Sequence, residues 1–214
     1  MCSIGMGPRP RSKNSYGSDD EPLGDRSSMK EAIKRLSQLL FGDYSIYRIY
    51  SRETGGGTVD MPRGHGLHFA RVEQAPVEAS ADTLIREQAW YFGIDSQVFA
   101  YLEGSRIISL CVFWHADRYR TRNFWPLAER EAKLVQIVTL PEKRGSGIAT
   151  GLIASASAAM FTNGFVRLYA RIWHSNAPSL RAFQRAGWER VATVIEIYPL
   201  RRKRPLRLTL RARR

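Results

Sequence analysis

The spacing of apolar residues along the chain predicts strands in some segments and helices in others. Residues 132–140 form the most apolar stretch and predict a buried strand that ends at Pro141. Residues 147–163 are mostly small and apolar and end at Gly164, which is typical of a helix and its C-terminal stop. Residues 205–211 alternate leucine with arginine or threonine, the period of a half-buried strand.

The remaining segments continue this alternation of strands and helices. Two apolar runs at residues 97–102 and 106–115 are separated by Glu-Gly-Ser and predict a β-hairpin. Further strands are predicted at residues 44–50, 67–72, 166–173 and 188–198, a loop at 51–66, and helices at 79–91 and 177–186. A helix is also predicted at residues 28–40, with an apolar face made of Ile33, Leu36, Leu39 and Leu40.

The first residues differ in composition from the rest of the chain. Residues 1–27 are rich in Gly, Pro, Ser and Asp, and have too few apolar side chains to offset the entropy cost of ordering. We therefore predict a disordered tail over residues 1–27. The total length of 214 residues then fits one domain of ordinary size over residues 28–214.

The net charge is strongly positive and is concentrated near the C-terminus. Lysines and arginines number 33 against 20 acidic residues, which gives a net charge of +13. Residues 201–214 hold eight of the basic residues and no acid, partly within the predicted strand at 205–211. Such a segment is able to hold nucleic acid or anionic lipid, but a solvated basic rim on a last strand is the favoured interpretation.

Cysteine content and hydropathy favour a reduced, cytoplasmic protein. Cys2 and Cys111 do not make a disulfide framework, and the first residues lack the apolar core of a signal peptide. Residues 145–166 are uncharged and long enough to span a bilayer, but glycine, serine, threonine and asparagine are spread through them. A glycine loop followed by a buried helix is the favoured interpretation, and no membrane span is expected.

A glycine-rich segment carries the sharpest chemical signal. Residues 141–151 read Pro-Glu-Lys-Arg-Gly-Ser-Gly-Ile-Ala-Thr-Gly between a predicted strand and a predicted helix, an arrangement that favours phosphate binding by backbone N–H groups. A Walker A loop is excluded because no lysine follows the last glycine. A dinucleotide fingerprint is disfavoured because four residues separate the strand from the first glycine, and no acid follows the next strand.

Two motifs in this region resemble those of the GNAT superfamily of N-acetyltransferases. Arg-Gly-Ser-Gly-Ile-Ala at residues 144–149 is similar to the superfamily's motif A, Q/R-x-x-G-x-G/A. Asn-Ala-Pro-Ser-Leu-Arg-Ala-Phe-Gln-Arg-Ala-Gly-Trp at residues 176–188 is similar to its motif B. One predicted helix and one strand separate the two motifs, as in the superfamily. The resemblance covers residues 132–198, and extends to 44–115 only through the order of elements.

The resemblance implies a fold and a cosubstrate. The expected fold is a single α/β domain with a mixed, mostly antiparallel sheet and helices on both faces, and the expected cosubstrate is acetyl-CoA. The loop would bind its pyrophosphate, the preceding strand would part from its neighbour and pair with pantetheine, and two residues of motif B would complete the site. The implied cofactor-binding residues are Val138, Thr139, Leu140, Arg144, Gly145, Ser146, Gly147, Ile148, Ala149, Asn176 and Phe183.

The catalytic groups are less clearly marked. An amine acceptor is mostly protonated at neutral pH, so a base helps it to attack, and Glu131 and His115 are the candidates. In the family, a tyrosine of motif B often protonates the departing thiolate, but this position is Phe183, which has no proton to give. Tyr169 or Tyr198, water, or no acid at all are the alternatives.

Other patterns add little to this interpretation. His65 and His68 have no partnering ligands nearby, so no metal is expected. The aromatic and basic residues at 90–92 and 118–125 are able to line an acceptor pocket, to bind nucleic acid or to belong to the core. The sequence thus predicts an N-acetyltransferase that acts on a small-molecule or protein amine by direct attack in a ternary complex. The alternative is a non-catalytic basic module that uses the same fold to bind nucleic acid or an anionic surface. Oligomeric state is left open.

Overall fold

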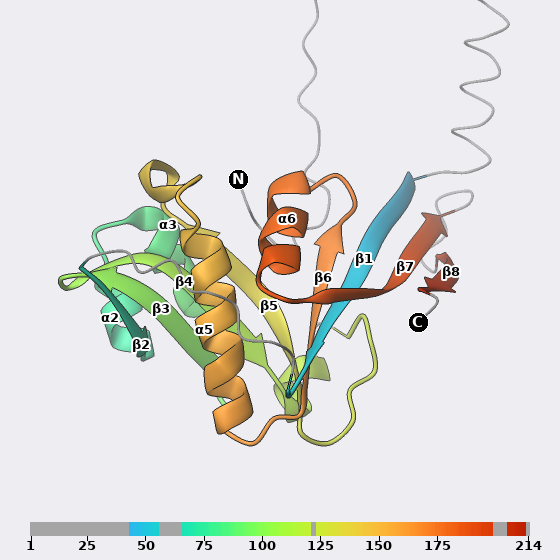
Figure 1. Cartoon of the computed structure of the whole chain (residues 1–214), viewed down its shortest axis with the longest axis horizontal. Helices are drawn as coiled ribbons and strands as arrows, with labels where there is room; N and C mark the ends of the chain where they lie inside the picture. Colours follow the sequence, from blue (N-terminus) through green and yellow to red (C-terminus); the bar gives the residue numbers. More distant parts are fainter. Residues whose placement is uncertain (1–42, 56–65, 121–122, 199–204, 213–214) are drawn as a thin grey trace, which may run out of the picture.

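In the computed structural model of the chain, the structure describes residues 43–55, 66–120, 123–198 and 205–212. These residues form one eight-stranded sheet with the strand order β2-β3-β4-β5-β6-β1-β7-β8 (Figure 1). Only β5 and β6 pair in parallel, which confirms the predicted mixed, mostly antiparallel sheet. The strands are β1 (Asp43–Glu53), β2 (Leu67–Arg71), β3 (Ser96–Glu103), β4 (Arg106–Trp114), β5 (Glu131–Thr139), β6 (Arg167–Trp173), β7 (Glu189–Tyr198) and β8 (Leu206–Arg211).

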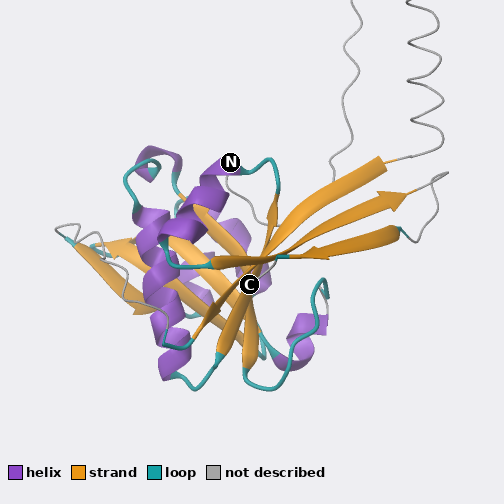
Figure 2. Ribbon diagram, turned by 45° about the vertical axis from the view of Figure 1, so that its right-hand side comes forward, coloured by secondary structure: helices purple, strands orange, loops and turns teal. Residues whose placement is uncertain are grey.

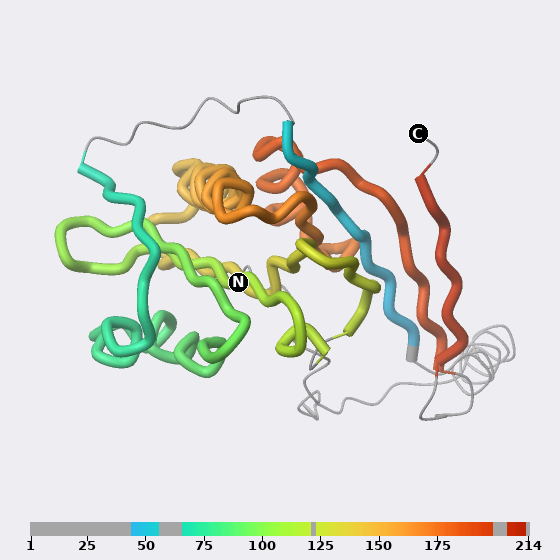
Figure 3. Tube along the Cα trace, turned by 90° about the horizontal axis from the view of Figure 1, so that it is seen from below, coloured from blue at the N-terminus to red at the C-terminus, as the bar shows by residue number. Residues whose placement is uncertain are grey.

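Helices cover both faces of the sheet, as expected (Figure 3). One face carries α5 (Ile148–Thr162) and α6 (Ala177–Arg185), and the other carries α2 (Gln74–Glu78), α3 (Thr83–Arg86), the 3-10 helix η1 (Glu87–Tyr91) and α4 (Ala116–Tyr119). A short 3-10 helix, η3 (Pro141–Lys143), joins β5 to α5. In the described part of the chain, no helix is long and apolar enough to cross a membrane.

Helix α5 is the uncharged helix that the sequence predicts behind the glycine loop. It buries most of its length because it packs against β3, β4 and β5. Its two buried serines have hydrogen-bond partners, so their polar atoms are tolerated in the core. Ser155 Oγ lies 2.9 Å from the Tyr101 hydroxyl, and Ser157 Oγ donates to the Ile153 carbonyl over 2.6 Å.

Several predicted elements differ in detail from the structure. The helix predicted at residues 79–91 begins only at Thr83, where α3 runs directly into the 3-10 helix η1 and ends at Tyr91, and the separate helix α2 precedes it. The Asp82 carboxylate pairs with Arg106 at 2.8 Å and makes no side-chain cap on α3. Strand β1 continues to Glu53, so a loop from residue 51 is wrong, and α4 was not predicted. The predicted tail at 1–27, the helix at 28–40 and the basic residues 201–204 lie outside the described residues.

Strand β1 lies inside the sheet although it is the first described strand in the sequence. It pairs with β6 on one side and with β7 on the other, both antiparallel. Together with β7 and β8 it extends beyond the helices (Figure 2). The strand predicted at residues 205–211 is confirmed as β8. The prediction that its leucines are buried on one side is wrong, because Leu206, Leu208 and Leu210 are 66%, 55% and 51% exposed. No described element covers the side of β8 on which they lie.

Lys133 of β5 is fully buried on the face opposite α5. Its Nζ contacts the Tyr119 hydroxyl, donates to the Trp125 carbonyl over 2.5 Å, and lies 3.8 Å and 3.5 Å from the ring centroids of Tyr119 and Phe124. Burial, together with the nearby positive charges of Arg171 and Arg207, lowers the pKa of this amine from 10.5 to about 5.

Candidate active site

Strands β5 and β6 part partway along their length. Their parallel pairing runs from Glu131 with Arg167 to Leu134 with Ala170 and then stops. Beyond this point β5 stays paired with β4 as far as Thr139. The edge of β5 that faces β6 is therefore not paired with β6 over residues 135–139, which leaves backbone groups on this side for another partner.

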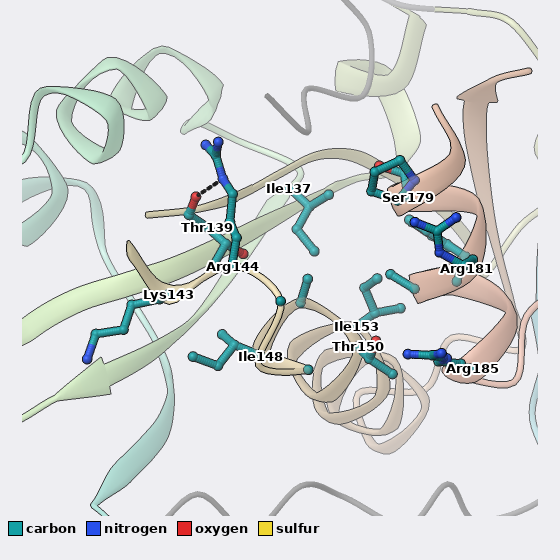
Figure 4. Close-up of a pocket in the computed structure, with 16 residues that line it drawn as sticks. Ile137, Thr139, Lys143, Arg144, Ile148, Thr150, Ile153, Ser179, Arg181 and Arg185 are labelled. Atoms are coloured by element: carbon teal, nitrogen blue, oxygen red, sulfur yellow. Dashed lines mark hydrogen bonds between the residues drawn. The ribbon is translucent and has the colours of Figure 1, made fainter. Parts of the chain in front are cut away.

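A cleft of about 490 Å³ opens beside this point, between the end of β5, the start of α5 and helix α6 (Figure 4). Its wall is apolar where β5 and α5 meet and basic toward the loop and α6. It is lined by Ile137, Thr139, Lys143, Arg144, Gly145, Gly147, Ile148, Ala149, Thr150, Ile153, Pro178, Ser179, Arg181, Ala182, Phe183 and Arg185.

The loop between η3 and α5 lines the cleft with two glycines. Gly145 and Gly147 have φ values of 81° and 84°, a region that favours glycine. Gly147 is the N-cap of α5 and offers no side-chain cap, so no side chain of the N-cap occupies the first-turn N–H groups. Two bonds hold the loop: Ser146 Oγ donates to the Lys143 carbonyl over 2.7 Å, and Arg144 Nε donates to the Thr139 carbonyl over 3.1 Å. The end of the helix is suited to an anion.

Four cationic side chains line the cleft, and three of them were missed from the sequence. Lys143 pairs with Glu103 at 2.8 Å and extends away from the cleft. Arg181 and Arg185 both extend from α6, and Arg185 points toward α5 (Figure 4). No described residue forms an ion pair with either arginine. Their spacing of four residues within motif B was the signal that could have revealed them, because it places both on one face of a helix.

Besides its two arginines, helix α6 places Ser179 and Phe183 at the cleft, and Asn176 caps its N-terminal end. The Asn176 side chain accepts from the Ser179 backbone N–H over 3.2 Å and does not line the cleft. Ser179 is 4% exposed, and its Oγ has no hydrogen-bond partner among the described residues. Phe183 is fully buried and packs edge-on against Trp188, with ring centroids 5.0 Å apart.

The structure brings together most, but not all, of the predicted cofactor-binding residues. Those that line the cleft are Thr139, Arg144, Gly145, Gly147, Ile148, Ala149 and Phe183. The side chains of Val138 and Leu140 are 5% and 2% exposed and belong to the core. Ser146 supports the loop and Asn176 caps α6, so neither side chain lines the cleft.

Glu131 and His115 lie away from the cleft. Glu131 begins β5, about 26 Å along the strand from Thr139, and is 8% exposed. One of its oxygens accepts from the Ala128 N–H over 2.8 Å, and the other lies 3.3 Å from Arg167 Nη1. His115 packs against Phe165, which follows the C-terminal end of α5. The cleft lies at the other end of this helix, at Gly147, and the helix is about 20 Å long. Burial lowers the pKa of His115, and Asp95 at 3.8 Å opposes this shift.

Solved structures share this fold. A putative GNAT acetyltransferase from Novosphingobium aromaticivorans is 18% identical with a TM-score of 0.50, and the alignment covers 73% of this chain and 65% of that one. A GNAT acetyltransferase from Colwellia psychrerythraea is 16% identical with a TM-score of 0.52, covering 78% and 60%. A GCN5-related N-acetyltransferase from Kribbella flavida is 16% identical with a TM-score of 0.51, covering 78% and 61%. The chain thus spans less than two thirds of these proteins.

Sequence comparison gives the family. No curated protein matches the chain. The family model described as the acetyltransferase (GNAT) family matches residues 65–188, which include the parting strands, the glycine loop and helix α6. This match confirms the resemblance inferred from the two motifs: the chain belongs to the GNAT acetyltransferase family.

Proposed function

We propose that this protein is an acetyl-CoA-dependent N-acetyltransferase, which transfers the acetyl group directly to an amine while both substrates are bound. The observation that carries this proposal is the cleft at the parting of β5 and β6. It is lined by the N-terminal end of α5 and by two arginines that form no ion pair within the described part of the chain. The acceptor is proposed to be a small-molecule or protein amine. A cytoplasmic location stays a prediction from the sequence.

The residues of the cleft fit acetyl-CoA in three respects. The loop offers backbone N–H groups and the α6 arginines offer charge, as a pyrophosphate requires. A Cβ added at Gly145 would meet no atom within 4 Å, so the chain leaves open space beside the loop. The apolar wall of Ile137, Ile148 and Phe183 suits a pantetheine arm, and the unpartnered Ser179 Oγ offers a polar contact. Acetyl-CoA would supply the activated thioester.

The cleft itself holds no acidic side chain and no histidine among its lining residues. We therefore propose that the acceptor amine loses its proton to water at the cleft. Glu131 and His115, the bases proposed from the sequence, would act only on an acceptor that extends well beyond the cleft. Glu131 is the less suited of the two because its oxygens already accept from Ala128 and pair with Arg167.

The direct test is binding and turnover of acetyl-CoA. We expect calorimetry to give about one site per chain, and thermal stability to rise at ligand concentrations well above Kd. Release of free CoA in the presence of a panel of amines would identify the acceptor class. Absence of binding at millimolar acetyl-CoA would contradict the proposal. Binding without turnover of any amine would favour the alternative of a non-catalytic binding module.

The two unpaired arginines give a second prediction. Replacing Arg181 and Arg185 together with alanine should raise Kd for acetyl-CoA about 5- to 30-fold at low salt, because each exposed charge contributes about 0.5–1 kcal/mol to phosphate binding. Calorimetry at low salt and at about 0.15 M salt should show the difference shrinking as screening increases.

The matched control replaces Arg190 and Arg211, which are exposed on β7 and β8 and do not line the cleft. This control removes the same net charge and should leave Kd within about twofold at about 0.15 M salt. Equal losses in both double variants would mean that net charge, and not the position on α6, attracts the ligand.

A further inference from the structure

Position 183 leaves a step of the proposed reaction without a proton donor. Phe183 is fully buried and lines the cleft, but its ring carries no hydroxyl. A thiolate that leaves acetyl-CoA is stabilised by protonation, so a hydroxyl near this ring would serve the step. If the proposed function holds, another residue of the buried cluster must supply that hydroxyl.

Tyr50 of β1 contacts Phe183 from the side of the sheet. The two ring centroids lie 6.4 Å apart at an angle of 49°. Tyr50 is 1% exposed, and its hydroxyl has no hydrogen-bond partner among the described residues. A buried hydroxyl without a partner costs about 1–3 kcal/mol. Tyr50 contacts the cleft through Phe183, which lines it, so a ligand bound in the cleft is a suitable partner for this hydroxyl.

The register of the sheet puts Tyr50 at the point where the strands part. Tyr50 pairs with Ala170 of β6, and Ala170 pairs with Leu134, which is the last parallel pair before β5 and β6 separate. Paired residues of neighbouring strands share one face of a sheet. Across the sheet, Ala170 is therefore the residue between Tyr50 on β1 and Leu134 on β5, and its side chain is small. Tyr50 also belongs to the same buried cluster as Leu134, Ile137 and Phe183.

The tyrosines considered from the sequence are less suited to this role. Tyr169 belongs to a different buried cluster, on the face that carries Lys133, where it packs against Trp125 with ring centroids 6.0 Å apart. Its hydroxyl accepts from Arg167 over 3.5 Å. Tyr198 is the last residue of β7 and pairs with Asp43, at the end of β1 remote from Tyr50.

We propose that Tyr50 donates its hydroxyl proton to the departing CoA sulfur, in place of the hydroxyl that Phe183 lacks. The amine nitrogen forms a bond to the acetyl carbon, the carbon–sulfur bond breaks, and the sulfur leaves with its electron pair. The sulfur takes the Tyr50 proton, the new amide nitrogen loses one proton to water, and the Tyr50 phenolate regains one from water. No proton or electron is gained or lost overall.

The test compares the single variant Tyr50→Phe with the double variant Tyr50→Phe/Phe183→Tyr. The measured quantity is the rate of CoA release with the amine that the wild type acetylates fastest. We expect Tyr50→Phe to lower kcat about 10- to 100-fold with KM for acetyl-CoA within about twofold, since a positioned acid contributes to the chemical step. The second substitution moves the hydroxyl across the contact between the two rings and should restore kcat at least tenfold. A merely structural role for Tyr50 would not give this rescue.

Tyr101→Phe is the matched control, because it removes a buried hydroxyl of the same cluster that is already bonded to Ser155, whereas the Tyr50 ring contacts the cleft-lining Phe183. It should change kcat by less than about threefold. Two results would overturn the role of Tyr50 but not the proposed function, provided that the wild type turns over. One is a kcat of Tyr50→Phe within about threefold of the wild-type value. The other is a loss of kcat that Phe183→Tyr does not restore, in a variant that is folded and binds acetyl-CoA. Absence of wild-type turnover overturns the proposed function and this role with it.

Discussion

Gly147→Val is expected to weaken acetyl-CoA binding at least about 100-fold and to leave the chain folded. Gly147 caps α5 with φ 84°, so its backbone lies where the loop turns into the helix. A branched side chain there would occupy the space next to the first-turn N–H groups. Loss of two charge-assisted bonds of about 1.5–3 kcal/mol each accounts for the factor. Calorimetry with acetyl-CoA measures it.

The same substitution at Gly164 separates binding from backbone strain. Gly164 has φ 92° and lies just beyond the other end of α5, where an added Cβ would meet no atom within 4 Å. Valine in this conformation costs about 1–3 kcal/mol at either glycine, which a typical domain tolerates. Gly164→Val should therefore lose similar stability but keep its affinity within about threefold. Wild-type affinity in Gly147→Val would show that the loop does not bind the phosphates.

Lys133→Met is expected to stabilise the protein at neutral pH by about 1–4 kcal/mol, because folding then no longer has to bury an amine that is charged in the unfolded chain. The amine is fully buried, and methionine fills a similar volume. The groups left behind keep partners, because the Tyr119 hydroxyl also donates to Asn123 over 2.7 Å and accepts from the Trp125 N–H over 2.8 Å. Urea unfolding of both proteins measures the difference.

The pH dependence of this gain follows from the lowered pKa of Lys133. The unfolded chain binds a proton below pH 10.5, whereas the folded chain binds it only below about pH 5. Between these values the unfolded state holds more protons, so this lysine makes stability rise with pH, by up to about 1.4 kcal/mol per unit. The advantage of Lys133→Met should therefore shrink as pH rises from about 6 toward about 10.

Lys143→Met is the control, since Lys143 is the other described lysine and forms a partly exposed pair with Glu103. It should change stability by less than about 1 kcal/mol. A destabilised Lys133→Met at neutral pH would contradict the prediction, and would mean that Lys133 is a charged ammonium held by the rings of Tyr119 and Phe124.

The sequence was sufficient to predict those parts of the site that are formed by residues close together along the chain. The Pro141 stop, the two glycines with positive φ and the helix that follows all belong to one short segment, and they lie where the motif predicted. Arg181 and Arg185 were within reach of the same reasoning. Glu131 and His115 were not, because their distance from the cleft depends on strand length and on which end of α5 they face.

The role proposed for Tyr50 could not be found in the sequence for a different reason. A strand was predicted around it, but an apolar pattern does not specify which strands pair. Tyr50 meets Phe183 only because β1 enters the sheet between β6 and β7. The burial of Lys133 likewise depends on the aromatic residues of the segment before β5, whose fold the pattern did not predict.

The place of β1 also sets an order of events during synthesis. This strand leaves the ribosome before every other described strand, yet its partners follow far later: the hydroxyl of Ser45 bonds to Glu196, 151 residues further on. Contacts over such separations form slowly, and both edges of β1 stay open until β6 and β7 have been made. The nascent chain therefore exposes two unpaired edges of β1 until β6 and β7 have emerged, and Tyr50 reaches Phe183 only after α6 has been synthesised.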